Sequence, residues 1–441
     1  GVFTYYWIGG SGNWSDGTHW SLSSGGTPAN LVPGTQVNVR FDANSGFTSA
    51  SKTVTVDLSI ASCNNMDWTG SLNSPVFGTT ASSNQLKIYG SLTLIPQMTY
   101  NFNGPIYFES VTTGQTITTA GRTILGDVYF NGNGGGWTLQ DIFKANNRSI
   151  YLNYGSLNTN GQTIMADKIE STIGNVRSLI LGNSLLILSY GSGGNFMYIN
   201  MNNMTLDGGS STIRSTANDN YTHNIYIYGS SVNPLNLYNL EFAGSIGIGR
   251  IYNGLSSSQI INFNNVSFAG NGTIEGNNTF QNLTFSSGKI YTLPSGKTQT
   301  IYGTLTANGG CGNDVVIQSS TSGSQSTIKK TSGNITVNYV SLKDSKAEGG
   351  AVFTANNSTD IGNNTGWIIT PPSGNYVTYY WIGGSGNWSD ASHWSLTSGG
   401  TPNPDGCIPN SSNSVVFDAN SGFTSASKTV TVDLSIASCN N

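Results

Sequence analysis

An asparagine-centred pattern of six residues recurs along the chain, with apolar residues at its first, fourth and sixth positions and asparagine at its third. Clear copies occupy residues 63–68, 201–206, 237–242, 263–268 and 280–285. The alternation after the asparagine places two apolar side chains on one face of a strand. Asparagine tolerates the left-handed backbone conformation of a sharp turn, so we predict a corner at each asparagine and a strand behind it.

Strands that turn at repeated corners form coils, and a coil of ~20–25 residues cannot bury its inner face unless it stacks on its neighbours. We therefore predict an all-β fold, a right-handed parallel β-helix. Its interior would hold rows of leucine, isoleucine, phenylalanine and valine, and asparagine side chains would form hydrogen-bonded ladders at the corners. An array of β-sandwiches would also contain short strands and turns, and it remains the alternative.

The composition favours an ordered chain. Charged residues make up 9 %, far below the ~25 % of ordinary soluble domains, yet 36 % of the residues are hydrophobic and 11 % aromatic. Disordered segments lack that apolar content. The net charge of −4 comes without a basic stripe, which argues against nucleic acid as a partner. No apolar run reaches the length of a membrane span, so we expect no membrane insertion.

A much longer repeat relates the two ends of the chain. Residues 4–16 return unchanged as 378–390, and residues 41–65 return unchanged as 417–441. The second copy has two extra residues before position 417 and gains Cys407 there. Identity over such stretches exceeds what a fold requires and indicates recent duplication. We expect a parent protein built from units of roughly 375 residues.

This repeat predicts the domain organisation. Residues 1–65 would form an aromatic-rich β cap with the first coils, and residues 66–370 the parallel β-helix. Residues 371–376 would be a short semi-rigid linker, because they begin with two prolines. Residues 377–441 would start the next unit. The chain begins within strand-like sequence and without a signal peptide, so we expect a processed chain or a fragment of a longer one.

Tyr5, Trp7, Trp14 and Trp20 form an aromatic cluster in the first copy. Solenoids need their open ends covered, so we predict that these rings form the core of a cap. The alternative is that Trp7, Trp14 and Trp20 stack on sugars, as aromatic faces do.

Two short turns resemble a calcium loop. Asp42 and Asn44, and their copies Asp418 and Asn420, place oxygen ligands at alternate positions. The full loop pattern and its terminal glutamate are missing. We favour a tight turn between strands, and calcium is the one cofactor that the sequence leaves open.

The four cysteines match no zinc-binding spacing. Cys407 came with the insertion in the second copy, and we predict a disulfide between Cys407 and Cys439. Cys63 occupies an apolar position of the asparagine pattern, which predicts a small buried side chain. Cys311 receives no assignment.

No catalytic constellation is recognisable in the sequence. Sugar-cleaving β-helices need clustered carboxylates, or a carboxylate beside a lysine or arginine, whereas the acidic residues here are dispersed along the chain and most lie in turns. His19 and His393 are copies of one position in a His-Trp-Ser motif, without the serine and aspartate partners of a triad. We predict that the chain is not an enzyme. A carbohydrate-binding module is the alternative, and a polysaccharide lyase or hydrolase is less favoured.

Residues 6–16, followed by His19-Trp-Ser and later by Phe41-Asp42, resemble a module of very large secreted proteins of the phylum Bacteroidota. The resemblance covers residues 1–65 and 377–441. Such proteins include β-helical surface proteins exported by the type IX secretion system, among them gliding-motility adhesins of the SprB kind.

The resemblance implies an extracellular, cell-surface protein. The chain would be a structural or adhesive repeat of a long filament that spaces or presents an adhesive tip and mediates surface attachment or gliding. Its expected partners are neighbouring repeat units of the same chain, with surface polysaccharide or other cell-surface proteins as further candidates. No ligand-binding residue is carried over from the resemblance.

Overall fold

The chain folds into a parallel β-solenoid. The computed structural model describes residues 2–231, 234–256, 259–371, 377–404, 406–411, 413–434 and 436–441. Strands make up 49 % of the chain and helices 2 %, and the solenoid has about 14 turns. The predicted parallel β-helix is confirmed. Residues 1–281 and 282–441 form two compact units, which are described separately below.

The first unit begins with a sheet in which all pairings are parallel except that of β1 with β3. In spatial order this sheet contains β22 (Met204–Asp207), β19 (Arg177–Ile180), β17 (Gly155–Asn158), β15 (Gly136–Leu139), β13 (Gln115–Thr118), β10 (Leu92–Thr93), β7 (Met66–Asp67), β4 (Val37–Arg40), β1 (Phe3–Trp7) and β3 (Trp20–Ser21). A second, short sheet contains β11 (Thr99–Tyr100), β8 (Val76–Thr79), β5 (Thr53–Val56) and β2 (Gly12–Asn13). The strands of residues 1–65 are therefore continuous with the coils that follow.

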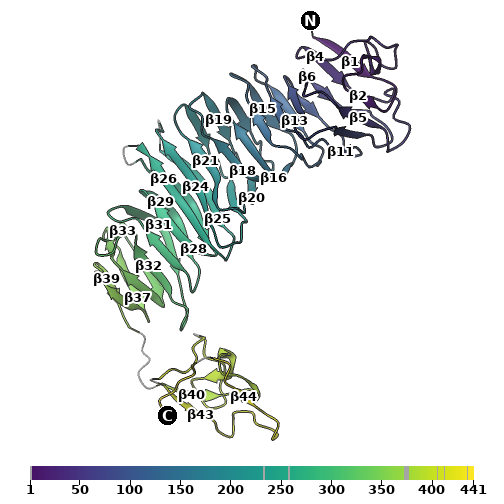
Figure 1. Cartoon of the computed structure of the whole chain (residues 1–441). Helices are drawn as coiled ribbons and strands as arrows, with labels where there is room; N and C mark the ends of the chain where they lie inside the picture. The colour runs from purple at the N-terminus through teal and green to yellow at the C-terminus, as the bar shows by residue number, and fades with distance from the viewer. Residues whose placement is uncertain are drawn as a thin grey trace. The chain divides into compact units, whose positions relative to one another are not determined.

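A third parallel sheet runs along the rest of this unit, and its strands lie side by side in Figure 1. It contains β6 (Ile60–Cys63), β9 (Gln85–Ile88), β12 (Ile106–Phe108), β14 (Val128–Phe130), β16 (Phe143–Leu152), β18 (Ile164–Ser171), β20 (Leu185–Leu188), β21 (Gly194–Asn200), β23 (Thr212–Ser215), β24 (Thr222–Gly229), β25 (Leu235–Phe242), β26 (Ile248–Leu255), β27 (Ile261–Phe268) and β28 (Asn271–Glu275). The unit boundary falls within β29 (Asn278–Phe285).

The second unit starts with further parallel coils and ends with the second copy of the repeat. The coils contain β30 (Ile290–Leu293), β31 (Thr298–Ala307), β32 (Val315–Ser319), β33 (Ser326–Lys329), β34 (Asn334–Asn338), β35 (Val340–Lys343), β36 (Ser345–Glu348), β37 (Val352–Asn356), β38 (Thr359–Gly362) and β39 (Trp367–Ile369). The repeat contains β40 (Thr378–Trp381), β41 (Gly386–Asn387), the 3-10 turn η3 (Ala391–His393), β42 (Trp394–Ser395), β43 (Ser414–Val416) and β44 (Val430–Thr431). Residues 372–376 of the predicted linker lie outside the described residues.

Rows of apolar side chains fill the interior, as the asparagine pattern predicts. Leu240 and Phe242, behind one asparagine, are 0 % and 4 % exposed. On the next coil Phe268 stacks on Phe242 with 4.6 Å between ring centroids. Coil length varies, since hydrogen-bonded partners on adjacent coils are 22 residues apart at Asn131 and 29 apart at Asn195. This variation explains the irregular spacing of the pattern in the sequence.

The prediction of a left-handed corner at each asparagine is wrong for most copies. Asn239 and Asn265 lie inside β25 and β27, which continue through the pattern. Among the described residues, Asn203 is the one pattern asparagine with a positive φ, 55°. The amide of Asn265 instead donates to the side-chain oxygen of Asn239 on the adjacent coil, at 2.9 Å. Because the side chain finds its partner across coils, the backbone stays extended.

Candidate functional site

The three tryptophans of the first repeat, residues 2–65, form a buried core. Trp7 on β1 pairs with Trp20 on β3, and their rings meet edge to face at 4.9 Å. Trp14 meets Trp20 in the same way at 5.0 Å, and all three side chains are 0 % exposed. The alternative that these rings stack on sugars is wrong for this fold, because no ring face reaches the surface. His19 lies flat on Trp7 at 4.8 Å and contacts the carbonyl oxygen of Ile8 through Nδ1 at 2.7 Å.

This aromatic core continues into the next coil. Phe41, directly after β4, stacks on Trp68 with 3.8 Å between centroids and 9° between planes. Phe47 stacks on the same tryptophan at 6.1 Å. The first repeat thus shares its core with residues 66–77, and Phe77 completes the contact with Trp68 at 5.5 Å.

The second repeat, residues 377–441, rebuilds the same arrangement. Trp381 pairs with Trp394, and the rings meet at 4.9 Å, as Trp7 and Trp20 do. His393 stacks on Trp381 at 4.7 Å. Strand β40 pairs in parallel with β43, and β41 with β44, which reproduces the pairings of β1 with β4 and β2 with β5. Identical sequence therefore gives the same start of a solenoid twice.

The proposed calcium residues form self-contained turns. The carboxylate of Asp42 accepts the backbone N–H of Asn44 at 2.9 Å, and the Asn44 amide donates to Ser24 Oγ at 2.9 Å. In the copy, Asp418 accepts from Asn420 N at 2.8 Å. Hydrogen bonds donated by the Ser398 hydroxyl and by the backbone N–H of Asn420 hold the pKa of Asp418 below its ordinary value. These bonds fit the tight turn that the sequence favours.

Six acidic side chains of the described residues form ion pairs with a lysine or an arginine on the same or an adjacent coil. The pairs are Arg40–Asp67, Lys87–Glu109, Lys168–Glu170, Arg214–Glu241, Arg250–Glu275 and Lys346–Glu348. In the described part of the chain, no group of three or more histidine, cysteine, aspartate or glutamate residues is placed to hold a metal ion. The same residues include no helix long and apolar enough to cross a membrane.

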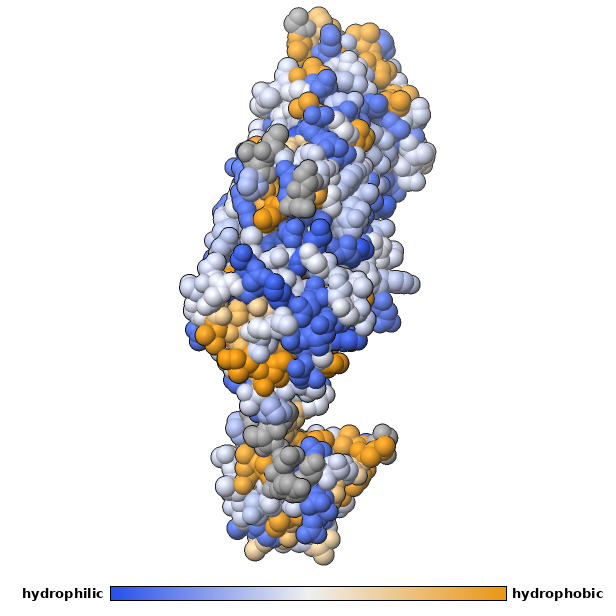
Figure 2. All heavy atoms as spheres, turned by 90° about the vertical axis from the view of Figure 1, so that its left-hand side faces the viewer, coloured by the Kyte–Doolittle hydropathy of each residue, from blue (hydrophilic) through white to orange (hydrophobic). Residues whose placement is uncertain are grey.

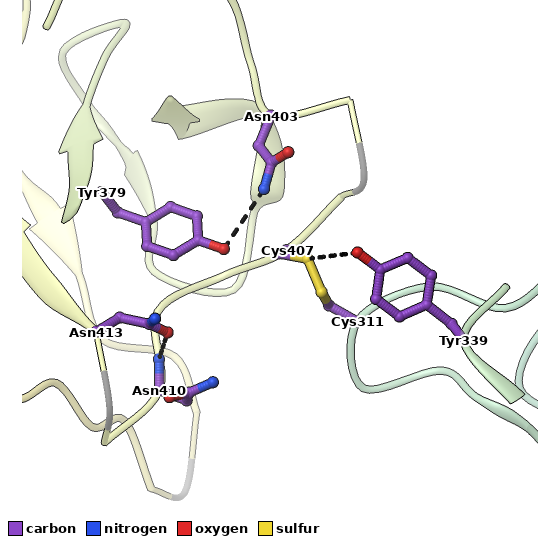
Figure 3. The surroundings of a disulfide bond; sticks show 7 residues. All are labelled: Cys311, Tyr339, Tyr379, Asn403, Cys407, Asn410 and Asn413. Atoms are coloured by element: carbon purple, nitrogen blue, oxygen red, sulfur yellow. Dashed lines mark hydrogen bonds between the residues drawn. A yellow bond between two sulfur atoms is a disulfide. The ribbon is translucent and has the colours of Figure 1, made fainter. Parts of the chain in front are cut away.

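The disulfide joins different cysteines from those predicted. Cys407 is bonded to Cys311, with 4.8 Å between the two Cα atoms (Figure 3). Cys439 is free and exposed. The predicted bond between Cys407 and Cys439 is therefore wrong. Pairing needs Cα atoms within roughly 7 Å of each other, and the segment inserted before position 417 brings Cys407 to the loop after β31. Cys63 is buried, as predicted, and burial raises the pKa of its thiol strongly.

The disulfide lies at an apolar junction within the second unit. Tyr379, Trp381, Trp388, Trp394 and Cys407 form one buried cluster. Cys311 and Tyr339 of the preceding coils pack against this cluster. The Tyr339 hydroxyl lies 3.8 Å from Cys407 Sγ, on the opposite side of the bond from Asn403 and Tyr379 in Figure 3. The second repeat is thus held to the coils before it by a covalent bond and by packing.

A row of tyrosines on the outside of the first unit escaped the sequence analysis. Register places one residue from each of nine consecutive coils in line on the third sheet, over ~38 Å at ~4.8 Å a coil. These residues are Lys87, Tyr107, Tyr129, Tyr151, Glu170, Tyr198, Tyr226, Tyr252 and Glu275. The signal in the sequence is an apolar-Tyr-apolar triplet, as at residues 106–108 and 128–130.

The rings of this tyrosine row cover one another. Tyr129 stacks on Tyr107 and on Tyr151, each at 4.6 Å. Lys87 Nζ lies 5.3 Å from the Tyr107 centroid, and Lys168 Nζ lies 5.5 Å from that of Tyr151, so cations cover the two outer faces. Glu170 interrupts the stack after Tyr151. Farther along the row, Tyr198 meets Tyr226 edge to face at 5.0 Å, and Tyr226 stacks on Tyr252 at 3.9 Å. The first three rings therefore offer edges and hydroxyls to a partner, and not faces.

No protein-family model, curated protein or solved structure matches the chain. The functional argument therefore depends on the repeat, the disulfide and the tyrosine row.

The packing of the tyrosine row leads us to expect that the stability of the chain depends on pH in the alkaline range. Partial burial, with the nearby charge of Asp127, raises the pKa of Tyr129 to about 12. An unfolded tyrosine ionises near pH ~10, so between these values the folded chain keeps a proton that the unfolded chain loses. Stability is therefore expected to fall as pH rises through this window. The phenolate absorbance of Tyr129, taken as the difference between the chain and Tyr129→Phe, should develop near pH 12. A midpoint at the ordinary value would contradict the packing described for this ring.

Proposed function

We propose that this chain is a structural and adhesive repeat of a long extracellular bacterial surface protein. In this role the solenoid acts as a rod that spaces or presents an adhesive tip for surface attachment or gliding. Its main partners are the neighbouring units of the same chain. The observation that carries the proposal is that residues 377–441 rebuild the strands and aromatic core with which residues 2–65 begin a solenoid.

Two further observations support this proposal. The disulfide between Cys311 and Cys407 suits an oxidising compartment outside the cytoplasm. It also reinforces the junction between the coils and the second repeat, which a rod under load requires. The dispersal of the acidic residues along the chain supports a non-catalytic role, because the sugar-cleaving sites of other proteins bring two carboxylates close together.

Electron microscopy of the intact parent protein, on cells and after purification, tests the proposal. We expect thin fibres with an axial repeat that matches one solenoid unit. A compact, freely secreted particle would contradict the role as a rod, and carbohydrate binding or cleavage would then be the favoured function.

Carbohydrate binding is the second candidate, and the tyrosine row favours it. The row presents a line of phenol hydroxyls. The charges of Lys87, Lys168 and Arg250 are paired with glutamates, so the row suits an extended, uncharged polymer. Affinity electrophoresis in gels that contain hydroxyethyl cellulose or xylan tests this candidate. Retardation that is lost in Tyr198→Ala and kept in Leu22→Ala, an exposed change elsewhere, would favour it.

A further inference from the structure

A groove lies beside the tyrosine row of the first unit, where strands of the third sheet begin. Its volume is about 430 Å³, within the ~300–1,000 Å³ of ordinary ligand sites. The residues that line it come from four consecutive coils and include Ser82, Asn103, Pro105, Asp127, Tyr129 and Arg148. Tyr129 belongs both to the groove and to the tyrosine row, so one extended ligand can contact both.

A bulge in β16 forms one wall of the groove. Three residues of this strand, 146–148, lie opposite the single residue Asp167 of β18. Asn147 in the bulge has a φ of 59°, a left-handed conformation that asparagine tolerates. All three bulge residues are exposed, and Arg148 lines the groove. Bulges re-aim side chains out of the regular alternation of a strand, and here the bulge directs Arg148 to the groove.

The guanidinium of Arg148 is available to a ligand. All six arginines of the chain lie within the described residues. The others bind a carboxylate or a backbone carbonyl oxygen, and they are Arg40, Arg122, Arg177, Arg214 and Arg250. Among these described arginines, Arg148 is the one whose side chain has neither a hydrogen bond nor an ion pair. The groove therefore contains a charged group with several N–H donors that a ligand can use.

Asp127 supplies an acceptor on the same wall. Its Oδ1 accepts the backbone N–H of Ser149, which directly follows the bulge, at 2.9 Å. This bond ties the coil of β14 to the end of the bulge and keeps the carboxylate and the Arg148 guanidinium at one groove. Burial raises the pKa of Asp167, opposite the bulge, and the charge of Asp127 raises it further. Two carboxylates and one guanidinium therefore share this part of the surface.

This combination suits an uncharged ligand that is rich in hydroxyl groups. Carboxylate oxygens accept hydrogen bonds from hydroxyl groups, a guanidinium donates to oxygen atoms, and Tyr129 adds a ring edge and a hydroxyl. A polyanion would be repelled by Asp127 and Asp167. The face of the solenoid in Figure 2 is mainly hydrophilic with separate apolar patches, so that face offers no continuous surface to an apolar polymer.

We propose that the groove binds one sugar residue of an uncharged glycan, whose neighbouring residues lie along the tyrosine row. Arg148 donates to oxygen atoms of that sugar, and Asp127 accepts from its hydroxyl groups. Tyr129 connects the groove to the row. The inference rests on carbohydrate binding, the second candidate function, and it assigns to the groove the choice between uncharged and acidic glycans.

Affinity electrophoresis of Arg148→Ala in gels that contain hydroxyethyl cellulose, xylan or polygalacturonate tests the groove. We expect at least one of the two uncharged polymers to retard the unchanged chain, and the acidic polygalacturonate to retard it least. Arg148→Ala should bind the same uncharged polymer ~10-fold more weakly, because hydrogen bonds from charged groups are the strong ones. Asp127→Asn should also weaken binding, although its amide oxygen can still accept the N–H of Ser149.

Arg214→Ala is the matched control. It removes the same charge from a surface ion pair on β23, away from the groove, and should bind as the unchanged chain does. Because Arg148 is exposed, its replacement should leave unfolding in urea unchanged. Hydrogen exchange of the amides in residues 103–107, 126–130 and 146–150 should slow in the presence of xylohexaose or cellohexaose. This protection should be lost in Arg148→Ala.

The outcomes separate the groove from carbohydrate binding itself. Equal retardation of the unchanged chain and Arg148→Ala, with loss of retardation in Tyr198→Ala, rejects the groove and keeps the tyrosine row as the binding surface. Absence of retardation in both uncharged polymers rejects carbohydrate binding and the groove with it. Stronger retardation by polygalacturonate than by either uncharged polymer overturns the assignment to an uncharged glycan.

Discussion

Replacing Arg177 with alanine is expected to lower the free energy of local unfolding around β19 by ~3 kcal/mol or more. The Arg177 side chain is almost fully buried, and its guanidinium faces oxygen atoms of the backbone. It donates hydrogen bonds of 2.6–2.9 Å to the carbonyl oxygens of Ser171, Asn175, Asn200 and Asn202 and to the Ser171 hydroxyl. Burial lowers the pKa of Arg177, and these oxygens offset the cost of burying its charge.

The effect of Arg177→Ala is expected to be large because the hydrogen-bond acceptors of Arg177 remain buried after the substitution. Alanine leaves several buried carbonyl oxygens without a donor, and each costs ~1–3 kcal/mol. Lysine restores the charge but lacks the planar fork of five donors, so Arg177→Lys should recover only part of the loss. Hydrogen exchange of the amides in residues 164–207 measures the effect.

Arg214→Ala is the matched control for this prediction. Arg214 pairs with Glu241 at the surface, where both side chains are more than a third exposed. Such pairs contribute ~0–1 kcal/mol. If Arg177→Ala and Arg214→Ala lowered the free energy of local unfolding equally, the buried guanidinium of Arg177 would contribute no more to stability than a surface ion pair.

Removal of the Cys311–Cys407 bond is expected to destabilise the second repeat by ~2–4 kcal/mol. The bond closes a loop across a sequence separation of 96 residues, and long loops gain most from closure because the unfolded chain loses more freedom. Unfolding of Cys407→Ser in urea, followed by the fluorescence of the buried Trp381 and Trp394, measures the loss. A reducing agent should give the same shift in the unchanged chain.

Cys439→Ser is the control, since Cys439 is a free, exposed residue that should contribute little. Chymotryptic digestion under non-reducing conditions tests the pairing directly. We expect one fragment in which the peptide of Cys311 is joined to that of Cys407. A fragment that joins Cys407 to Cys439, or equal destabilisation by both substitutions, would restore the pairing favoured by the sequence.

Local patterns predicted much of the fold because strand geometry imposes them. Alternation behind the asparagines assigned Leu240 and Phe242 to the interior, and both are buried. The long repeat predicted that Trp381 and Trp394 would match Trp7 and Trp20, and the ring contacts agree. Each of these features depends on residues that are close together in the sequence, so the sequence alone is enough to predict it.

The prediction of a corner at each asparagine failed because the same residue type can take two different arrangements. Asparagine can stabilise a left-handed corner, or it can hydrogen-bond to an asparagine one coil away while its backbone stays extended. Asn203 takes the first arrangement, and Asn265 takes the second. The choice depends on whether the adjacent coil presents a partner, which the local pattern does not contain.

The sequence by itself determined the β-solenoid class, its apolar interior and the repetition of its starting module. Only the tertiary structure decided which cysteines meet, where the tryptophan faces lie and which tyrosines align. Coils of different length must stack before Tyr107, Tyr129 and Tyr151 fall into register. In the same way, the loop after β31 must reach the inserted segment before Cys311 can meet Cys407. Register and loop contact arise from packing between distant residues, so strand periodicity alone does not specify them.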